Sequence, residues 1–410
     1  MGFIAETVWQ FSTANSITFG VGASAELEAI CQSRGADRIF VVTDAGIVDA
    51  GLLAQITDPL ESVSIEVFAE VEPDPSLSTF ETAVDRTRMV DPDLVVGLGG
   101  GSAMDVAKTA GIIAEHGGDV IEYVAPPTGA GRSIPGPGIP TIAIPTTSGT
   151  GSETTPVAVI SLPDADLKVG ISTPHQRPVE AIVDPALTVT LPPGPTAASG
   201  IDALSHAIEA YTTRRYDAKP APADRSNRPT YNGRTILTDA LAAEAIELIA
   251  TNLRTAVDNG DDLDARSSMA LGSLLAGIAF SNAGLGVTHA IAMATGAVKH
   301  SPHGVTIAHV LPAVMEYNAT SVSDRYGTVA AALGVSTDGL DRSELGRTAA
   351  AAVGRLAADV GIEGGLRSIG VEDSDVAYLA DRSAKLERLT VGNPRRVDTA
   401  ALEDIIRTAL

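Results

Sequence analysis

Short apolar runs alternate with longer amphipathic stretches over the first half of this 410-residue chain. The runs at residues 37–46, 92–101 and 140–155 are rich in Val, Ile and Leu, and each leads into aspartate, glycine, serine or threonine. Buried strands that alternate with helices are typical of βαβ units on a largely parallel sheet. Past residue 191 strand patterns nearly vanish, and apolar residues recur at helical spacing, as in residues 236–257 and 267–280.

This change of pattern predicts two domains. The stretch LPPGPTAASG separates the two patterns, so we place the boundary near Pro192 and Pro193. We expect an α/β domain over residues 1–192 and an all-helical domain over residues 193–410. Within the second domain, residues 214–234 contain several prolines and charges and interrupt the helical pattern, so we expect an excursion between helices there.

The composition is that of a soluble globular protein, with 44% hydrophobic and 4% aromatic residues. No apolar run reaches the roughly 20 residues of a membrane span, and the N-terminus lacks the basic start of a secretory signal. The single cysteine, Cys31, excludes an internal disulfide and a cysteine-based zinc site. We therefore expect a cytoplasmic protein.

The net charge of −23 disfavours nucleic acid and anionic membranes as partners, because phosphate binding requires clustered basic residues. Lysines number only 5 against 23 arginines, and acidic residues dominate. Such a surface is tolerable where salt screens it, so we expect adaptation to a halophilic habitat. This bears on the environment of the protein and not on its reaction.

Four residues have the chemistry of a metal site. Asp202 and His206 lie four apart in a helical pattern and so project from one face, while His289 and His303 follow further along the chain. One carboxylate and three imidazoles suit iron(II) or zinc, whereas calcium and magnesium require oxygen ligands. Taken singly, each residue also has an ordinary interpretation as a partly buried histidine or a helix salt bridge.

Several residues after the predicted strands have the chemistry of a dinucleotide site. Glycines directly after a strand let the backbone approach a pyrophosphate at the following helix, although the third glycine of GxGxxG is absent. Asp44 ends a strand, where a carboxylate can accept from the adenosine ribose and repel a 2′-phosphate, which would favour NAD over NADP. An ordinary turn aspartate is the alternative. Ser102 and Asp105 also match a capping box that needs no ligand. The candidate cofactor-binding residues are Asp44, Gly100, Gly101, Ser102, Asp105, Thr146, Thr147 and Thr150.

The segments GGGSAMDVAK, PTTSGTGSETT, GIDALSHAIEAY and GVTHAIAMATGAVKHSPHG, in this order, resemble the iron-containing (group III) alcohol dehydrogenase family. The resemblance implies a dehydroquinate synthase-like fold, with an α/β dinucleotide-binding domain, an all-α domain, and nicotinamide held beside a metal in the cleft between them. It implies a homo-oligomer, a dimer or larger. It also places the metal ligands on Asp202, His206, His289 and His303, the cofactor residues on the set above, and Lys168 near the cofactor ribose, where a solvated lysine is the alternative.

One position departs from this family. Most alcohol-active members carry a histidine beside the nicotinamide where this chain has Met293, one helical turn after His289. Met293 should still point into the active site, but a thioether cannot relay a proton. Either the proton leaves by another route, with His300 a candidate, or the preferred substrate differs.

The segment 214–234 and the stretch IEYVAPPTGAGRSIPGPG resemble the hydroxyacid-oxoacid transhydrogenase branch of the same family, although the match is incomplete. That branch implies tightly bound NAD and a hydroxyacid substrate, whose carboxylate Arg214, Arg215, Arg225 or Arg228 could pair with; surface salt bridges are the alternative. Two further alternatives are a lyase resembling 3-dehydroquinate synthase, which the scarce lysines disfavour, and a non-catalytic protein with a structural metal.

Overall fold

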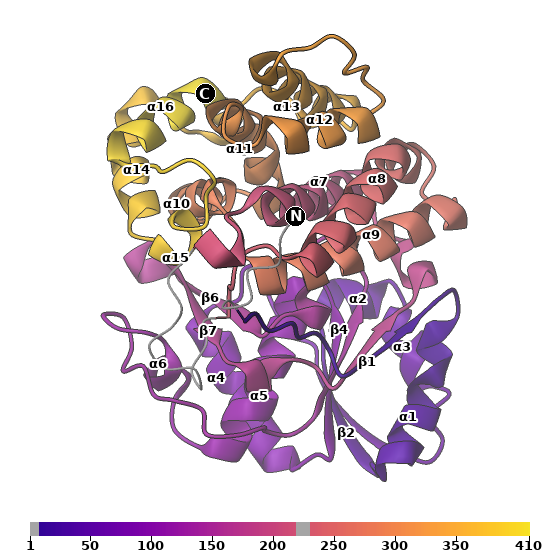
Figure 1. The fold of residues 1–410 in the computed structure, drawn as a ribbon. Coiled ribbons are helices and arrows are strands. Elements are labelled where there is room, and N and C mark those ends of the chain that lie inside the picture. Colours follow the sequence, from indigo (N-terminus) through magenta and orange to yellow (C-terminus); the bar gives the residue numbers. More distant parts are fainter. Residues whose placement is uncertain (1–7, 219–229) are drawn as a thin grey trace. The chain divides into compact units, whose positions relative to one another are not determined.

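The computed structural model describes residues 8–218 and 230–410, which form two compact units (Figure 1). One unit is Thr13–Leu191, and the other is Pro192–Leu410 together with the described residues before Thr13. The grouping of the residues before Thr13 with the helical unit differs from the expected range of 1–192 for the α/β domain. Residues 8–12 group with the helices because, for example, Ser12 N–H donates to Asn282 Oδ1 (2.8 Å) and Asn282 Nδ2 donates back to the Ser12 carbonyl (2.8 Å).

A six-stranded sheet, parallel throughout, forms the centre of the first unit, in the order β1-β8-β5-β4-β2-β3. The alternation of β-branched runs with helices therefore gives the predicted α/β fold. The strands of this sheet are β1 (Ser16–Phe19), β2 (Arg38–Val42), β3 (Ser64–Phe68), β4 (Leu94–Gly99), β5 (Thr141–Pro145) and β8 (Glu180–Val183).

Successive residues of each strand point to opposite faces, so the sheet separates two cores. Phe40 and Val42 face one core, to which α4 and α5 contribute, and Ile39 and Val41 face the other, to which α1 and α3 contribute. The helices of this unit are α1 (Leu27–Arg34), α2 (Ala45–Asp49), α3 (Leu52–Thr57), α4 (Leu77–Val90), α5 (Gly101–His116) and α6 (Val120–Tyr123).

Two local features differ from the sequence-based expectation. An antiparallel hairpin, β6 (Val157–Leu162) and β7 (Leu167–Ser172), follows β5 and packs on the same core as α5. The capping box expected from Ser102 and Asp105 is wrong: Gly100 is the N-cap of α5 and no side chain caps it, because Asp105 bonds elsewhere.

The second unit is helical as predicted. Pro192 is the N-cap of α7 and Pro193 its first residue, a position where the missing N–H costs nothing. Its largest core lies among α7, α8, α9, α11 and α13. The helices are α7 (Pro193–Thr212), α8 (Ile236–Asp258), α9 (Leu263–Ala283), α10 (Val287–Lys299), α11 (His303–Asn318), α12 (Ser323–Ala332), α13 (Arg342–Asp359), α14 (Val376–Ala384), α15 (Glu387–Thr390) and α16 (Thr399–Ala409).

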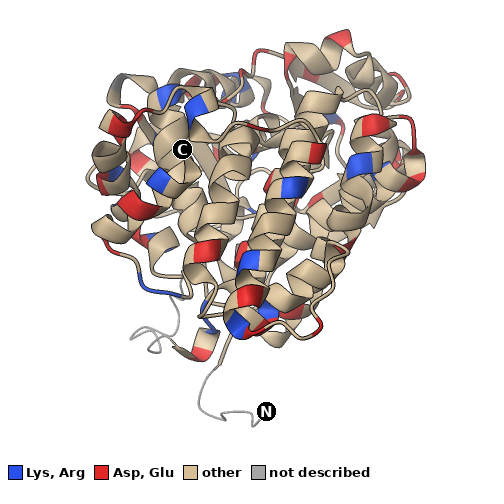
Figure 2. Cartoon of the chain, turned by 90° about the horizontal axis from the view of Figure 1, so that it is seen from above, with Lys and Arg blue, Asp and Glu red and all other residues tan. Residues whose placement is uncertain are grey.

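Within the described ranges, no single helix is long and apolar enough to cross a bilayer, and only α9 with α10, bent by 101°, meets that criterion as a pair. Charged positions are distributed over the outer helices of the second unit (Figure 2). Acidic positions lie among the basic ones there, and many form ion pairs, such as Arg254 with Asp359 (2.7 Å) and Lys385 with Asp381 (2.6 Å).

Candidate functional site

Helix α7 positions one half of the candidate metal centre. Asp202, His206 and Glu209 are spaced i, i+4 and i+7, so all three project from the same face of the helix. All three are about 95% buried, each with 5% of its surface exposed. Buried polar residues at such positions need partners, and α10 and α11 supply them from more than 75 residues away.

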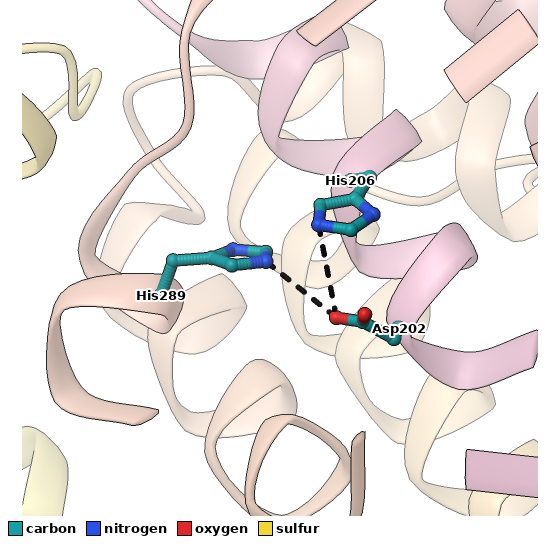
Figure 3. Close-up of side chains that lie close together, drawn as sticks. All are labelled: Asp202, His206 and His289. Carbon is teal, nitrogen blue, oxygen red and sulfur yellow. Dashed lines mark ion pairs between the residues drawn. The ribbon is translucent and has the colours of Figure 1, made fainter. Parts of the chain in front are cut away.

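The candidate ligands converge on one carboxylate oxygen. Asp202 Oδ1 lies 3.8 Å from His206 Nε2, 3.6 Å from His289 Nε2 and 3.7 Å from His303 Nε2. In Figure 3 the rings of His206 and His289 both point at this oxygen from α7 and α10. The ligand atoms of Asp202, His206 and His289 lie within 4.8 Å of one another. His303, the first residue of α11, approaches the same oxygen with a more exposed ring, 32% accessible.

These distances and donors fit a divalent ion. Ligand atoms about 2.1 Å from one tetrahedral ion lie about 3.4 Å apart, close to the 3.6 to 3.8 Å between Asp202 Oδ1 and the three imidazole nitrogens. Asp202 Oδ1 and His289 Nε2 are buried and have no hydrogen-bond partner within the described part of the chain. A cation at this point would satisfy both atoms, and nitrogen with oxygen donors suits iron(II) or zinc.

Glu209 belongs to this site, although its sequence position alone did not reveal it. Its Oε2 lies 2.6 Å from His289 Nδ1 and accepts from Gly286 N–H (2.9 Å), while Oε1 accepts from Thr288 N–H (2.8 Å). The ring of His289 is therefore held between two carboxylates of α7: Nδ1 faces Glu209 and Nε2 faces Asp202. The spacing of Asp202 and Glu209, seven residues apart on one helical face, was the available signal.

The electrostatics of the site follow from this arrangement. Burial acts to raise the pKa of Asp202, but the surrounding His206, His303 and His289 lower it far below its usual range. Burial likewise acts to raise the pKa of Glu209, and its contacts with His289 and two backbone N–H groups lower it. Burial acts to lower the pKa of His289, but Glu209 and Asp202 raise it to about 9. The site thus carries concentrated negative charge that favours a cation.

Apolar side chains border the metal site on one side. The ring of Phe280 stacks on His206, with centroids 4.3 Å apart, and His206 in turn stacks on His289 at 4.6 Å. Met293 is 9% exposed and packs in one cluster with Phe280 and Leu285. The thioether is therefore part of an apolar cluster that reaches the candidate ligands. His300, the alternative proton route, is an exposed residue at the end of α10 with φ of 51°.

The glycine-rich turn and the threonine loop of the first unit lie side by side. Gly99 of β4 and Pro145 of β5 are register partners, so the segments that follow them leave the same edge of the sheet. A Cβ on Gly101 would lie 2.7 Å from Thr150 Cγ2, and one on Gly100 would lie 3.8 Å from Thr147 Cγ2. Thr146 N–H donates to Gly99 O (3.0 Å). The contact at Gly101 is too close for an unshifted side chain, whereas the one at Gly100 is ordinary van der Waals contact. With glycine at both positions, the backbone N–H groups at the start of α5 can be approached closely, as a pyrophosphate site demands.

Asp105, one of the predicted cofactor-binding residues, is bonded to groups of the protein itself. Its Oδ1 accepts from Ser152 Oγ (2.5 Å) and pairs with Lys108 Nζ (2.9 Å), and its Oδ2 accepts from Val159 N–H (2.9 Å). Both carboxylate oxygens are thus engaged within the protein, and they hold the threonine loop against α5. Ser102 lies in the first turn of that helix, partly exposed.

Two other predicted cofactor residues are also placed by local bonds. Asp44 Oδ1 accepts from Ile47 N–H (3.1 Å) as the N-cap of α2, while Oδ2 faces Gly99, whose Cβ would lie 3.3 Å from it. Asp44 therefore stands beside the glycine turn. Lys168 Nζ pairs with Asp74 Oδ1 at 2.6 Å.

The four arginines considered for substrate carboxylates divide into two groups. Arg215 forms a two-pronged pair with Asp217, with Nε to Oδ1 at 2.9 Å and Nη2 to Oδ2 at 2.6 Å. Arg214 N–H donates to the Gly392 carbonyl (3.0 Å). Arg225 and Arg228 lie outside the described residues.

Comparisons with known proteins agree with the motifs. The family model "Iron-containing alcohol dehydrogenase" matches residues 14–185, and "Fe-containing alcohol dehydrogenase family, C-terminal" matches residues 231–410. Long-chain-alcohol dehydrogenase 1 of Geobacillus thermodenitrificans (strain NG80-2) is 40% identical, over 95% of this chain and 94% of the relative. The mitochondrial hydroxyacid-oxoacid transhydrogenase of Xenopus tropicalis is 32% identical, over 95% and 88%. The crystal structure of sulfoacetaldehyde reductase from Bifidobacterium kashiwanohense in complex with NAD+ aligns with a TM-score of 0.83 and 28% identity, covering 98% of each chain.

Proposed function

The chain belongs to the iron-containing alcohol dehydrogenase family and is an oxidoreductase, and we propose that it transfers hydride between NAD and a small alcohol or hydroxyacid at a metal held by Asp202, His206, His289 and His303. The observation that carries the proposal is the convergence of three imidazole nitrogens on Asp202 Oδ1, a carboxylate oxygen that has no hydrogen-bond partner among the described residues. A metal bound there would act as a Lewis acid that polarises the substrate oxygen.

The residues of the site have complementary tasks in this reaction. Asp202 supplies negative charge that offsets the cation, and the three histidines supply neutral donors that leave net positive charge for the substrate oxygen. The burial of Asp202, His206 and His289 keeps water from competing for the ion, which strengthens each electrostatic contact. Phe280 and Met293 give the adjoining cluster an apolar character, which supports a substrate whose carbon chain is uncharged near the metal.

For the cofactor we propose NAD rather than NADP. The glycine turn at Gly100 and Gly101 leaves the first N–H groups of α5 accessible to a pyrophosphate. Asp44 beside that turn supplies a carboxylate that accepts from ribose hydroxyls and repels a 2′-phosphate. The likeness to an NAD+ complex supports the same choice.

Metal content tests the ligand set. His303→Ala should lose bound iron or zinc and lose turnover, because three ligands with one exposed side hold a divalent ion poorly. His309→Ala is the matched control: it removes a histidine of the same helix, bonded to Ser368 Oγ (3.1 Å), and should retain both. A metal-free His303→Ala protein with full activity would overturn the proposal.

A substrate panel tests the reaction. Primary alcohols, diols and hydroxyacids should be offered with NAD and with NADP to protein reconstituted separately with iron and with zinc. We expect turnover with free NAD and an alcohol, and lower kcat/KM with NADP. The alternative that the transhydrogenase relative suggests predicts NAD that copurifies, never exchanges and is reoxidised only by a 2-oxoacid.

A further inference from the structure

A second carboxylate of α7 contacts a candidate metal ligand from the side away from the ion. Glu209 Oε2 lies 2.6 Å from His289 Nδ1, while the other ring nitrogen, Nε2, lies 3.6 Å from Asp202 Oδ1. A neutral imidazole carries a single proton, on one nitrogen or the other. The nitrogen that faces the ion must be the one without the proton.

We infer that Glu209 is the positioning residue of the metal centre: it keeps the His289 proton on Nδ1 and so presents Nε2 to the ion. The inference rests on the proposed function, since it requires a metal at Asp202. A carboxylate only accepts hydrogen bonds, so a neutral His289 beside Glu209 must donate from Nδ1. The same contact fixes the plane of the ring, because the bond to Oε2 joins two buried side chains.

Glu209 is itself held rigidly by backbone donors. Gly286 N–H donates to Oε2 (2.9 Å) and Thr288 N–H to Oε1 (2.8 Å), so both oxygens are fixed at the start of α10. The N-cap residue of α10, Gly286, has no side chain to cap the helix, and the carboxylate of Glu209 on α7 accepts from its first N–H groups instead. The start of α10, the Glu209 side chain and the His289 ring are thereby ordered together.

Glutamine cannot reproduce this arrangement although it has nearly the same shape. Three donors converge on Glu209, and a glutamine side chain has one acceptor atom. If the amide oxygen replaces Oε2, its NH2 group faces Thr288 N–H, donor against donor. If it replaces Oε1, the NH2 group faces His289 Nδ1 and favours the tautomer with its proton on Nε2, where the ion should bind.

The metal affinity of a Glu209 variant measures how far Glu209 prepares His289 to bind the ion. The dissociation constants of Zn²⁺ and Co²⁺, determined by chelator competition, should be about 10 to 100 times higher in Glu209→Gln than in the unaltered protein, the usual effect of losing such a partner. Glu180→Gln is the matched control. Glu180 is equally buried at 5% but lies on β8, where it accepts from Thr18 and pairs with Arg34, so its removal should leave both constants unchanged.

A purely structural role for Glu209 makes a different prediction. If Glu209 only capped α10, Glu209→Gln would lower the melting temperature of the metal-free protein and leave the dissociation constants within about twofold; that result overturns the inference and leaves the proposed function standing. An unaltered protein that binds neither ion overturns both.

A measurement on the unaltered protein covers the case in which Glu209→Gln fails to fold. In Co²⁺-loaded protein with 15N-labelled histidine, the ring proton of His289 should reside on Nδ1 and exchange slowly with solvent, since Glu209 accepts it in a buried site. A proton on Nε2, or cobalt bound through Nδ1, would overturn the inference.

Discussion

At the residue scale, His289 makes the metal-free protein sensitive to alkaline pH. Glu209 and Asp202 outweigh burial and raise its pKa to about 9, above the value of about 6.5 in an unfolded chain. The protonated ring therefore stabilises the fold fully below about pH 6.5, and this contribution is lost as the pH rises to about 9. Urea unfolding of the metal-free protein should show a loss of about 3 kcal/mol over that range.

The interval from pH 7.5 to 9 isolates this effect. Glu153 also titrates nearby, because burial raises its pKa to about 7. The loss of folding stability that its ionisation causes is therefore nearly complete at pH 7.5. The free energy of unfolding of the metal-free His289→Gln variant should stay constant between pH 7.5 and 9. The zinc affinity of the unaltered protein should rise over the same interval, because the proton leaves Nε2. Constant stability of the unaltered metal-free protein would contradict the assignment of this titration to His289.

Single residues also show where sequence reasoning succeeds and where it ends. Helical spacing was enough to put Asp202 and His206 on one face, because i,i+4 geometry is local. The same spacing puts Glu209 on that face, but it could not reveal that Glu209 contacts His289, 80 positions away, nor that Asp105 bonds to Ser152, 47 positions away. Such contacts depend on how helices and loops pack, and a pattern along one segment carries no information about them.

At the scale of elements, Lys108 ties α5 to the threonine loop. Its ammonium group is fully buried, pairs with Asp105 Oδ1 (2.9 Å) and donates to Ser152 Oγ (2.7 Å) and to the Val157 carbonyl (2.6 Å). Burial lowers the pKa of Lys108, but Asp105 opposes that shift. One side chain on the helix therefore holds both the loop after β5 and the first residue of β6.

Removing this cation should destabilise the α/β unit strongly. Lys108→Met removes the cation that pairs with the Asp105 carboxylate and donates to the Val157 carbonyl, and we expect this to cost about 3 to 5 kcal/mol of unfolding free energy. Lys385→Met, which breaks an exposed pair with Asp381, should cost less than about 1 kcal/mol. Urea unfolding monitored by fluorescence compares the two, and equal losses would show that the buried pair does not hold the loop.

The elements differ in how far the sequence predicts them. Strands β2, β4 and β5 were predicted because each is a continuous apolar run that ends in turn residues, as buried parallel strands do. The hairpin of β6 and β7 was not singled out, since its exposed and buried residues mix: β7 is partly exposed at most positions. Its place is set by packing on the α5 core and by bonds such as Val159 N–H to Asp105, which are tertiary.

At the scale of the whole molecule, the family and the fold class were predicted correctly, whereas the unit to which residues 8–12 belong was not. Domain ranges drawn from pattern changes assume that neighbours in sequence share a core. Ser12 instead bonds to Asn282 near the end of α9, and a local sequence pattern cannot predict a contact between residues 270 positions apart.

The net charge of −23 predicts that salt stabilises the whole molecule. With 51 acidic against 28 basic residues, the folded chain repels itself at low ionic strength, and salt screens this repulsion as the Debye length falls from about 10 Å at 0.1 M to about 3 Å at 1 M. The melting temperature of the metal-free protein should therefore rise by several degrees between about 0.1 M and 1 M NaCl. Screening depends on ionic strength and not on the identity of the cation, so KCl at equal ionic strength should give the same rise. A melting temperature that falls with salt would mean that the ion pairs between helices, which salt weakens, contribute more to stability than the relief of self-repulsion.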